Sequence, residues 1–221
     1  MTQTIVVTGA NRGIGLSLVQ YYLAQGHRVL GVCRQRSPAL EASGAIIIDD
    51  VDVAVDADIQ HLQQALESES IDLLINNAGI LGDEQLEQLD ADSIRLQFEV
   101  NALAPLRVTA ALQSQLKKGA KVALITSRMG SIADNSSGGR YGYRMSKAAL
   151  NAAGKSLAVD FKPQGIAVAI LHPGLVATDM IGGQGDLTPD EAAARLAQRI
   201  TQLTLDNSGT FWHSNGEELP W

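Results

Sequence analysis

The feature that most constrains the fold is a recurring pattern of short apolar runs that are mostly separated by longer helical stretches. The runs are apolar throughout, which is typical of parallel strands buried on both faces of a sheet. Crossovers between parallel strands are right-handed in nearly all proteins. We therefore predict an α/β fold with a doubly wound, Rossmann-type parallel sheet flanked by helices. The expected strands are Thr4–Thr8, Arg28–Cys33, Ala45–Ile48, Ile71–Asn76, Lys121–Ser127 and Ile166–Leu171.

The stretches between these runs are expected to be helical. We predict one extended helix over Ser93–Gln115. Thr188-Pro189-Asp190-Glu191 is a capping box with proline at the first helical position, and it opens a helix to about Leu203. No repeat, low-complexity tract or linker interrupts the 221 residues, so a single domain over 1–221 is expected. The other elements expected are helices at Gly15–Gly26, about Asp56–Glu67 and Tyr143–Phe161, and a last strand within Gly209–His213.

Charge and composition exclude several classes of protein. The net charge is −7 and no run of Lys or Arg offsets it, which argues against nucleic-acid and anionic-membrane partners. No apolar run reaches the ~20 residues of a membrane span, and we expect no signal peptide. The single cysteine, Cys33, cannot form an internal disulfide. We therefore expect a cytoplasmic protein.

A glycine-rich turn follows the first expected strand. Thr8–Gly15 reads TGANRGIG, with glycines at 9, 13 and 15, and it leads directly into a helix. Glycines at such a turn let the backbone approach a pyrophosphate, and a helix N-terminus offers free N–H groups to phosphates. The turn predicts nucleotide binding by Gly9, Asn11, Arg12, Gly13, Ile14 and Gly15. An ordinary strand-to-helix turn is the alternative.

The end of the second strand indicates which nucleotide binds. An acidic residue there would meet a ribose 2′-hydroxyl, and a basic residue would meet a 2′-phosphate. The sequence has Arg34 there and no carboxylate at the strand end, and Arg12 lies in the glycine turn. These residues favour NADP(H) over NAD(H). The alternative is that both arginines are solvated surface charges.

Tyr143 and Lys147 are four residues apart, which places both on one face of a helix. A nearby ammonium favours the phenolate, so the pKa of the tyrosine is expected to fall toward neutral pH, where it can exchange a proton with a substrate. The same spacing also arises by chance. Tyr141 competes with Tyr143, but only Tyr143 has a lysine four residues later.

Taken in order, these motifs resemble the short-chain dehydrogenase/reductase family over nearly the whole chain. The landmarks are the Thr8–Gly15 turn, Asn76-Asn77-Ala78-Gly79, Asn101, Ser127, the Tyr143/Lys147 pair and Pro173-Gly174. The C-terminal part is similar to a subgroup that contains C-factor-type signalling proteins and sniffer-like carbonyl reductases.

The resemblance implies a set of catalytic roles. Tyr143 would exchange the proton with the substrate oxygen, and Lys147 would lower the pKa of Tyr143 and bind the nicotinamide ribose. Ser127 would donate a hydrogen bond to the substrate oxygen. Asn101 would hold a water that connects Lys147 to solvent. The alternatives are that Ser127 only ends a strand and that Asn101 is a solvated helical side chain.

The resemblance also implies the rest of the cofactor site. Asp52 would lie against the adenine. The alternative is that Asp52, which belongs to an acidic stretch, is only a solvated surface charge. For Asn76 and Asn77, the alternative to a role in the site is that they only form a turn. No metal ligands are expected. The residues implied for the cofactor, besides the glycine turn, are Arg34, Asp52, Val53, Asn77, Ala78, Gly79, Tyr143, Lys147, Pro173, Gly174, Val176 and Thr178.

Two segments depart from the family pattern. Ser127 lies sixteen positions before Tyr143, further than is usual, and this suggests an extended loop over 134–141, with Ser131 as a weaker candidate for the serine. The segment Asp179–Leu187, where the family has a substrate-covering element, is short and glycine-rich. We expect an open site with broad specificity or a large substrate.

The resulting hypothesis is an NADPH-dependent oxidoreductase that reduces aldehydes or ketones. The alternative is a cofactor-binding signalling or sensor protein of C-factor type with little turnover. A homodimer or homotetramer is expected from family pairing, because Ala102–Leu116 and Met145–Phe161 carry small residues that allow close helix packing.

Overall fold

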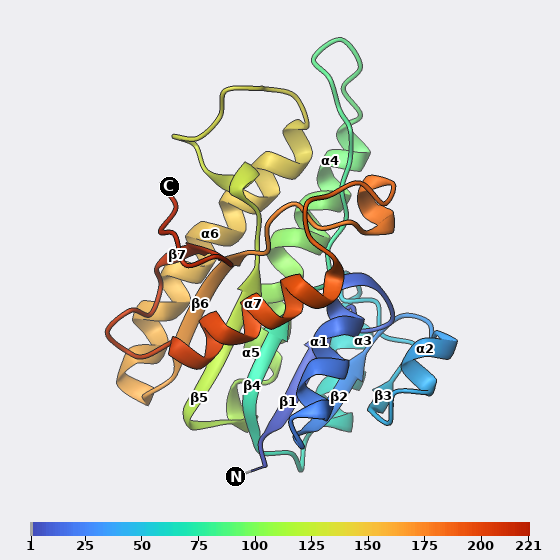
Figure 1. Cartoon of the computed structure of the whole chain (residues 1–221), viewed down its shortest axis with the longest axis vertical. Helices are drawn as coiled ribbons and strands as arrows, with labels where there is room; N and C mark the ends of the chain where they lie inside the picture. Colours follow the sequence, from blue (N-terminus) through green and yellow to red (C-terminus); the bar gives the residue numbers. More distant parts are fainter. Residues whose placement is uncertain (1) are drawn as a thin grey trace.

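Seven strands lie side by side and parallel in the computed structural model, which describes residues 2–221. Their order across the sheet is β3-β2-β1-β4-β5-β6-β7 (Figure 1). The predicted parallel α/β sheet is confirmed, including the last strand. The bounds are β1 Thr4–Thr8, β2 Arg28–Val32, β3 Ile46–Ile48, β4 Ile71–Asn76, β5 Leu116–Ile125, β6 Ala167–His172 and β7 Phe211–His213.

Helices cover both faces of the sheet, as doubly wound topology requires. On one face, Leu18 of α1 and Leu196 of α7 belong to the same apolar core; these two helices lie in front of the sheet in Figure 1. On the other face, Leu62 of α3, Val108 of α5 and Leu150 of α6 form the second core. Within residues 2–221, no helix is both long and apolar enough to span a membrane. The α-helices are α1 Gly13–Ala24, α2 Pro38–Glu41, α3 Asp56–Ala65, α4 Ala91–Phe98, α5 Ala104–Ala111, α6 Tyr141–Phe161 and α7 Pro189–Gln202.

The expected single helix over Ser93–Gln115 is wrong. The chain instead forms α4, a π-helical segment over Glu99–Leu103, and α5. Proline explains the change, because Pro105 has no N–H to donate to the carbonyl of Asn101 four residues earlier. The N–H of Ala104 bonds to the carbonyl of Glu99, five residues back, as in a π-helix. The carbonyl of Asn101 therefore lacks its α-helical donor.

The strand expected over Lys121–Ser127 is in fact β5, Leu116–Ile125, so Ser127 lies after the strand and not in it. Two helix starts also differ. α1 begins at Gly13 and α6 at Tyr141, each two residues before the expected start. The short α2 was not predicted, although its signal was present in the sequence: Ser37 accepts a hydrogen bond from the N–H of Leu40 and Pro38 follows it. The capping box at Thr188 forms as predicted.

Candidate active site

A cavity of about 900 Å³ lies at the carboxyl ends of the strands. Its walls are the loops that follow β1 to β6, together with the first turns of α6. The sequence-predicted residues that line it are Gly9, Asn11, Arg12, Gly13, Ile14, Arg34, Asp52, Val53, Asn77, Ala78, Gly79, Ser127, Tyr143, Lys147, Pro173, Gly174, Val176 and Thr178. Gly15 and Asn101 do not line it. The cavity size lies in the upper part of the ~300–1,000 Å³ range of small-molecule and cofactor sites.

Gly15 shapes the glycine turn from behind. A Cβ atom added at Gly15 would lie 2.1 Å from the carbonyl oxygen of Gly9 and 2.6 Å from Nδ2 of Asn77. Only glycine permits this approach of α1 to the turn. The cavity-facing part of the turn comprises Gly9 to Ile14.

Thr8 and Asn77 join the ends of β1 and β4. The Thr8 hydroxyl accepts hydrogen bonds from the N–H groups of Asn77 (3.0 Å) and Ala78 (3.1 Å). In return, the Asn77 amide donates to the carbonyls of Thr8 (3.0 Å) and Gly9 (3.3 Å). Thr8 belongs to the predicted turn, but this role was not predicted, because it depends on which strands are neighbours in the sheet.

Two arginines reach the part of the cavity near the end of β2. The Arg34 side chain is 65% exposed and lies 3.7 Å from the Asp52 carboxylate, and the Arg12 side chain is 71% exposed and lies 4.0 Å from Asp179. Both pairs are weak, exposed contacts. Arg36, by contrast, is held by two hydrogen bonds to Asp49 and does not line the cavity. Arg34 and Arg12 are therefore the cations available to a phosphate group.

Ser127, Tyr143 and Lys147 meet at the opposite part of the cavity. Lys147 Nζ lies 5.8 Å from the centroid of the Tyr143 ring and donates a hydrogen bond to the carbonyl of Ile125 at 3.0 Å. The Ser127 hydroxyl acts on the Tyr143 phenol by lowering its pKa, so the two side chains are near one another. The two alternatives, Ser131 and Tyr141, do not line the cavity, and the Ser131 hydroxyl accepts from the N–H of Asp134.

The expected lowering of the Tyr143 pKa by Lys147 is wrong for this structure. Burial raises the pKa of Tyr143, and the Ser127 hydroxyl and the charge of Arg140 offset only part of that rise. Burial also lowers the pKa of Lys147, to about 8. Desolvation outweighs the attraction between the two groups, because each is removed from water.

Asn101 lies behind the cavity and is fully buried. Its amide nitrogen donates to the carbonyl of Ile80 (2.9 Å) and to Ser146 Oγ (3.0 Å), and its amide oxygen accepts from the N–H of Ile80 at 2.8 Å. The side chain thus joins the loop after β4 to α6. The expected role of Asn101 in holding a water stays a prediction.

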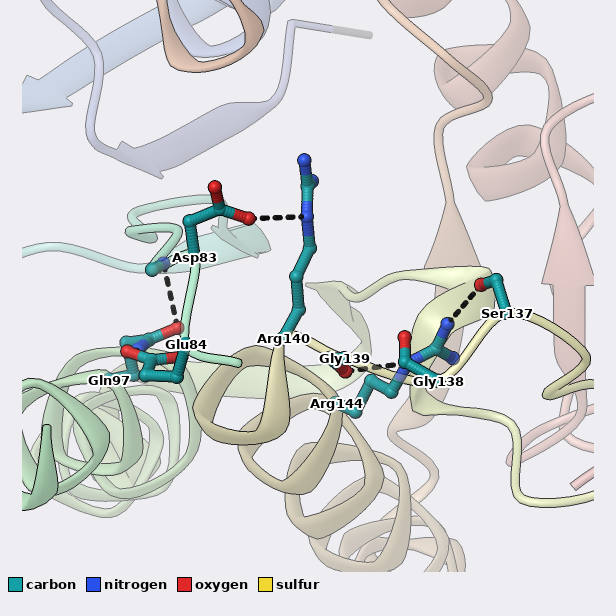
Figure 2. A network of polar contacts seen from close by, with 9 residues as sticks. Asp83, Glu84, Gln97, Ser137, Gly138, Gly139, Arg140 and Arg144 are labelled. Carbon is teal, nitrogen blue, oxygen red and sulfur yellow. Dashed lines mark hydrogen bonds and ion pairs between the residues drawn. The ribbon is translucent and has the colours of Figure 1, made fainter. Parts of the chain in front are cut away.

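A buried carboxylate lies at the start of α6 and was missed from the sequence. Glu84 is 4% exposed and accepts hydrogen bonds from Ser93 and Gln97. Figure 2 shows Glu84 beside Gln97. Burial alone would raise the pKa of Glu84, but hydrogen bonds from Ser93, from Gln97 and from the N–H of Gly142 lower it. Arg140, the N-cap residue, makes no side-chain cap of its own. The N–H of Arg140 donates to the backbone carbonyl of Glu84 at 2.8 Å, which ties the start of α6 to the loop after β4. The carboxylate oxygen Oε2 of Glu84 has no hydrogen-bond partner among the described residues.

His172, at the end of β6, is a second buried titratable group at the cavity that was missed. Burial, followed by the charges of His213 and Arg128, lowers the pKa of His172 to about 3. Its ring packs edge-on against His213, with the ring centroids 4.9 Å apart. A neutral imidazole therefore forms part of the wall beside Pro173.

The short segment after Thr178 folds into a loop with a fixed base. The N–H of Ala177 donates to the carbonyl of Leu187 (2.8 Å), and the N–H of Leu187 donates to the carbonyl of Leu175 (3.1 Å). Asp179, Met180 and Ile181 line the cavity from this loop. The segment is short, as predicted, and its role in covering a substrate stays a prediction.

The burial of Lys147 predicts a cost in stability. Its pKa of about 8, against 10.5 for a free lysine, corresponds to about 3 kcal/mol that opposes folding at pH 7. We expect Lys147→Met, which removes the buried charge, to raise the free energy of unfolding at pH 7 by about 1–3 kcal/mol in urea denaturation. The increase in the free energy of unfolding of Lys147→Met over the wild type should be full below pH 8. It should disappear as pH rises toward 10.5, where the lysine of the unfolded wild type also loses its proton. A lower stability of the variant at pH 7 would contradict this account.

Comparison with known proteins identifies the family. Residues 3–188 match the model of the family described as short chain dehydrogenase. The chain is 39% identical over 224 residues to 1-hydroxy-2-glutathionyl-2-methyl-3-butene dehydrogenase of Rhodococcus sp. (strain AD45), covering 99% of each chain. It is 45% identical over 154 residues to C-signal of Myxococcus xanthus, covering 68% of this chain and 93% of that protein.

Solved structures agree with this relationship. The structure of a carbonyl reductase from Pseudomonas aeruginosa PAO1 in complex with NADP superposes with a TM-score of 0.88, at 33% identity and 100% coverage of both chains. The expected similarity to C-factor-type proteins and to carbonyl reductases is thereby confirmed. The chain belongs to the short-chain dehydrogenase family.

Proposed function

We propose that the protein is an NADPH-dependent reductase of aldehydes or ketones. The observation that carries the proposal is that one cavity is lined both by the glycine turn with Arg12 and Arg34 and by Ser127, Tyr143 and Lys147. One part of the cavity thus suits a phosphate-rich cofactor and the other suits proton transfer. The likeness to a carbonyl reductase in complex with NADP supports the assignment.

The cofactor would extend from the glycine turn to Lys147. Arg34 and Arg12 would hold the 2′-phosphate, Asp52 and Val53 would lie against the adenine, and the backbone of 77–79 would pass beside the ribose. Pro173, Gly174, Val176 and Thr178 would line the nicotinamide end. When bound, NADPH supplies a hydride to the carbonyl carbon and leaves as NADP⁺.

Tyr143 would supply the proton that completes the alcohol. Because burial raises its pKa, the phenol carries its proton at neutral pH and is ready to donate it to the carbonyl oxygen. This is the protonation state that the reductive direction requires. Ser127 would hydrogen-bond the same oxygen as negative charge develops on it. Lys147 would stabilise the phenolate that remains, and Asn101 would hold the water through which the proton is replaced.

A signalling role with little turnover is the second candidate. The 45% identity to C-signal of Myxococcus xanthus favours it. The intact set of Ser127, Tyr143 and Lys147 at the cavity favours catalysis instead.

The sequence-based expectations of a cytoplasmic location and of a homodimer or homotetramer stay predictions. The single cysteine, Cys33, is buried, which is compatible with a reducing compartment.

Removing the phenol hydroxyl tests the catalytic assignment. We expect Tyr143→Phe to lower kcat for carbonyl reduction by about 10²–10⁴-fold, because the general acid is lost. NADPH affinity, measured by fluorescence titration, should change little. Tyr141→Phe is the matched control, since Tyr141 lies two residues away and outside the cavity, and it should keep full activity.

Two results would contradict the proposal. If Tyr143→Phe retains nearly full activity, Tyr143 is not the proton donor. If the wild type binds NADPH but reduces no aldehyde or ketone in a broad panel, the signalling role is favoured.

The cofactor preference is tested by charge reversal at Arg34. We expect Arg34→Asp to raise the Kd for NADPH about 10–100-fold and the Kd for NADH by less than about threefold, because the new carboxylate repels only the 2′-phosphate. Arg36→Asp makes the same charge change two residues away, outside the cavity, and serves as the control. Equal losses for both cofactors in Arg34→Asp would show that Arg34 does not bind the 2′-phosphate.

A further inference from the structure

Two arginines at the start of α6 occupy positions that are unfavourable for the helix. Arg140 is the N-cap residue and has a left-handed backbone (φ 50°), and Arg144 follows four residues later. The first turn contains no acidic residue. Cations at a helix N-terminus oppose its dipole, and like charges four residues apart repel. A non-glycine residue in the left-handed region adds to the cost. Local conflicts of this kind are expected where a function requires them.

Both arginines line the cavity next to Tyr143. Figure 2 shows their side chains leaving the same end of α6 in different directions, Arg140 toward Asp83 and Arg144 toward the loop 137–139. The charge of Arg140 acts on the titration of Tyr143, so its guanidinium is near the phenol. The pair therefore belongs to the substrate part of the cavity, whereas Arg12 and Arg34 belong to the cofactor part.

The charges of this pair are poorly compensated. Arg144 bonds only neutral groups, the carbonyls of Gly138 and Gly139 and the Ser137 hydroxyl (2.8 Å). Among residues 2–221 it forms no ion pair. Arg140 Nε lies 3.3 Å from Asp83, whose side chain is 79% exposed, so solvent screens that pair. The protein as a whole carries a net charge of −7, which makes a positive cavity mouth a local exception.

Hydrogen-bond donors also remain available there. A guanidinium has five N–H donors, and Arg144 uses only Nε and Nη2 for its contacts with the loop. Its Nη1 and the two Nη groups of Arg140 make no hydrogen bond with another described residue. The planar fork of a guanidinium matches the two oxygens of a carboxylate. A guanidinium therefore binds a carboxylate more strongly than it binds a neutral group.

We infer that Arg140 and Arg144 bind a carboxylate carried by the substrate, so that the substrate class is carbonyl compounds with a negatively charged group. This inference rests on the proposed reductase function. The two guanidiniums attract the anionic group, and the carbonyl is thereby placed toward Tyr143 and Ser127. The positive mouth also raises the local concentration of such substrates.

Two probes with the same aldehyde test the inference. 4-Carboxybenzaldehyde carries a carboxylate, and methyl 4-formylbenzoate carries its neutral ester. We expect the wild type with NADPH to show a kcat/KM at least about tenfold higher for the carboxylate, which corresponds to about 1.4 kcal/mol. The preference should shrink as salt increases, because the arginines are partly exposed.

Arginine variants show whether this pair causes the preference. Arg140→Gln and Arg144→Gln should each lower the ratio of kcat/KM values about tenfold, and Arg144→Lys should retain part of it. Arg95→Gln, an exposed arginine of α4 outside the cavity, is the control and should leave the ratio unchanged. Loosening of the loop 137–139 in Arg144→Gln would affect both aldehydes equally, so the ratio isolates charge recognition.

Specific outcomes would overturn the inference. A wild-type ratio near one, or a ratio unchanged in both glutamine variants, shows that the pair does not select a carboxylate. If neither aldehyde is reduced, the proposed reductase function fails, but carboxylate binding is still open to test. Calorimetry on the Tyr143→Phe protein with NADPH then measures the binding of each aldehyde. Tighter binding of 4-carboxybenzaldehyde than of its ester, lost on adding Arg140→Gln, supports the inference, and equal affinities refute it.

Discussion

The hydrogen bonds between Thr8 and Asn77 hold the site together at the point where the winding of the sheet reverses. From β1 the chain winds outward through β2 and β3, and from β4 it winds the other way, so the loops after β1 and β4 separate and leave a crevice. The side chains at 8 and 77 each bond the other strand's end, which fixes the width of that crevice. The glycine turn, and Gly15 packed behind it, take their position from this junction.

α6 carries the chemistry at a cost in stability. Lys147 is buried with a lowered pKa, Tyr143 is partly buried with a raised one, and two arginines oppose the helix dipole. The carbonyl of Glu84 accepts a hydrogen bond from the N–H of Arg140 and so ties the start of α6 to the loop after β4. Asn101 binds the same loop to α6 from the π-helical segment. Stability is thus exchanged for a fixed arrangement of titratable groups, as is common at active sites.

The fold was largely predictable because continuous apolar runs and capping signals are local properties of the sequence. The choice of Ser127 over Ser131, and of Tyr143 over Tyr141, was also predictable, since the structure brings Ser127, Tyr143 and Lys147 to one cavity. The π-helical segment was not predicted, although Pro105 is its local cause. Glu84 and Thr8 could not be assigned from sequence, because their roles depend on partners brought close only by the fold. The direction of the Tyr143 pKa shift was wrong because burial cannot be read from spacing.

The most direct test follows the transferred hydrogen. Reduction of an aldehyde with NADPH carrying deuterium at one C4 position of the nicotinamide should place one deuterium on the carbinol carbon, as measured by mass spectrometry. Because the cavity would hold the cofactor in one orientation, label at only one of the two C4 positions should transfer. An alcohol formed without deuterium from either position would contradict hydride transfer from a cofactor bound in this cavity.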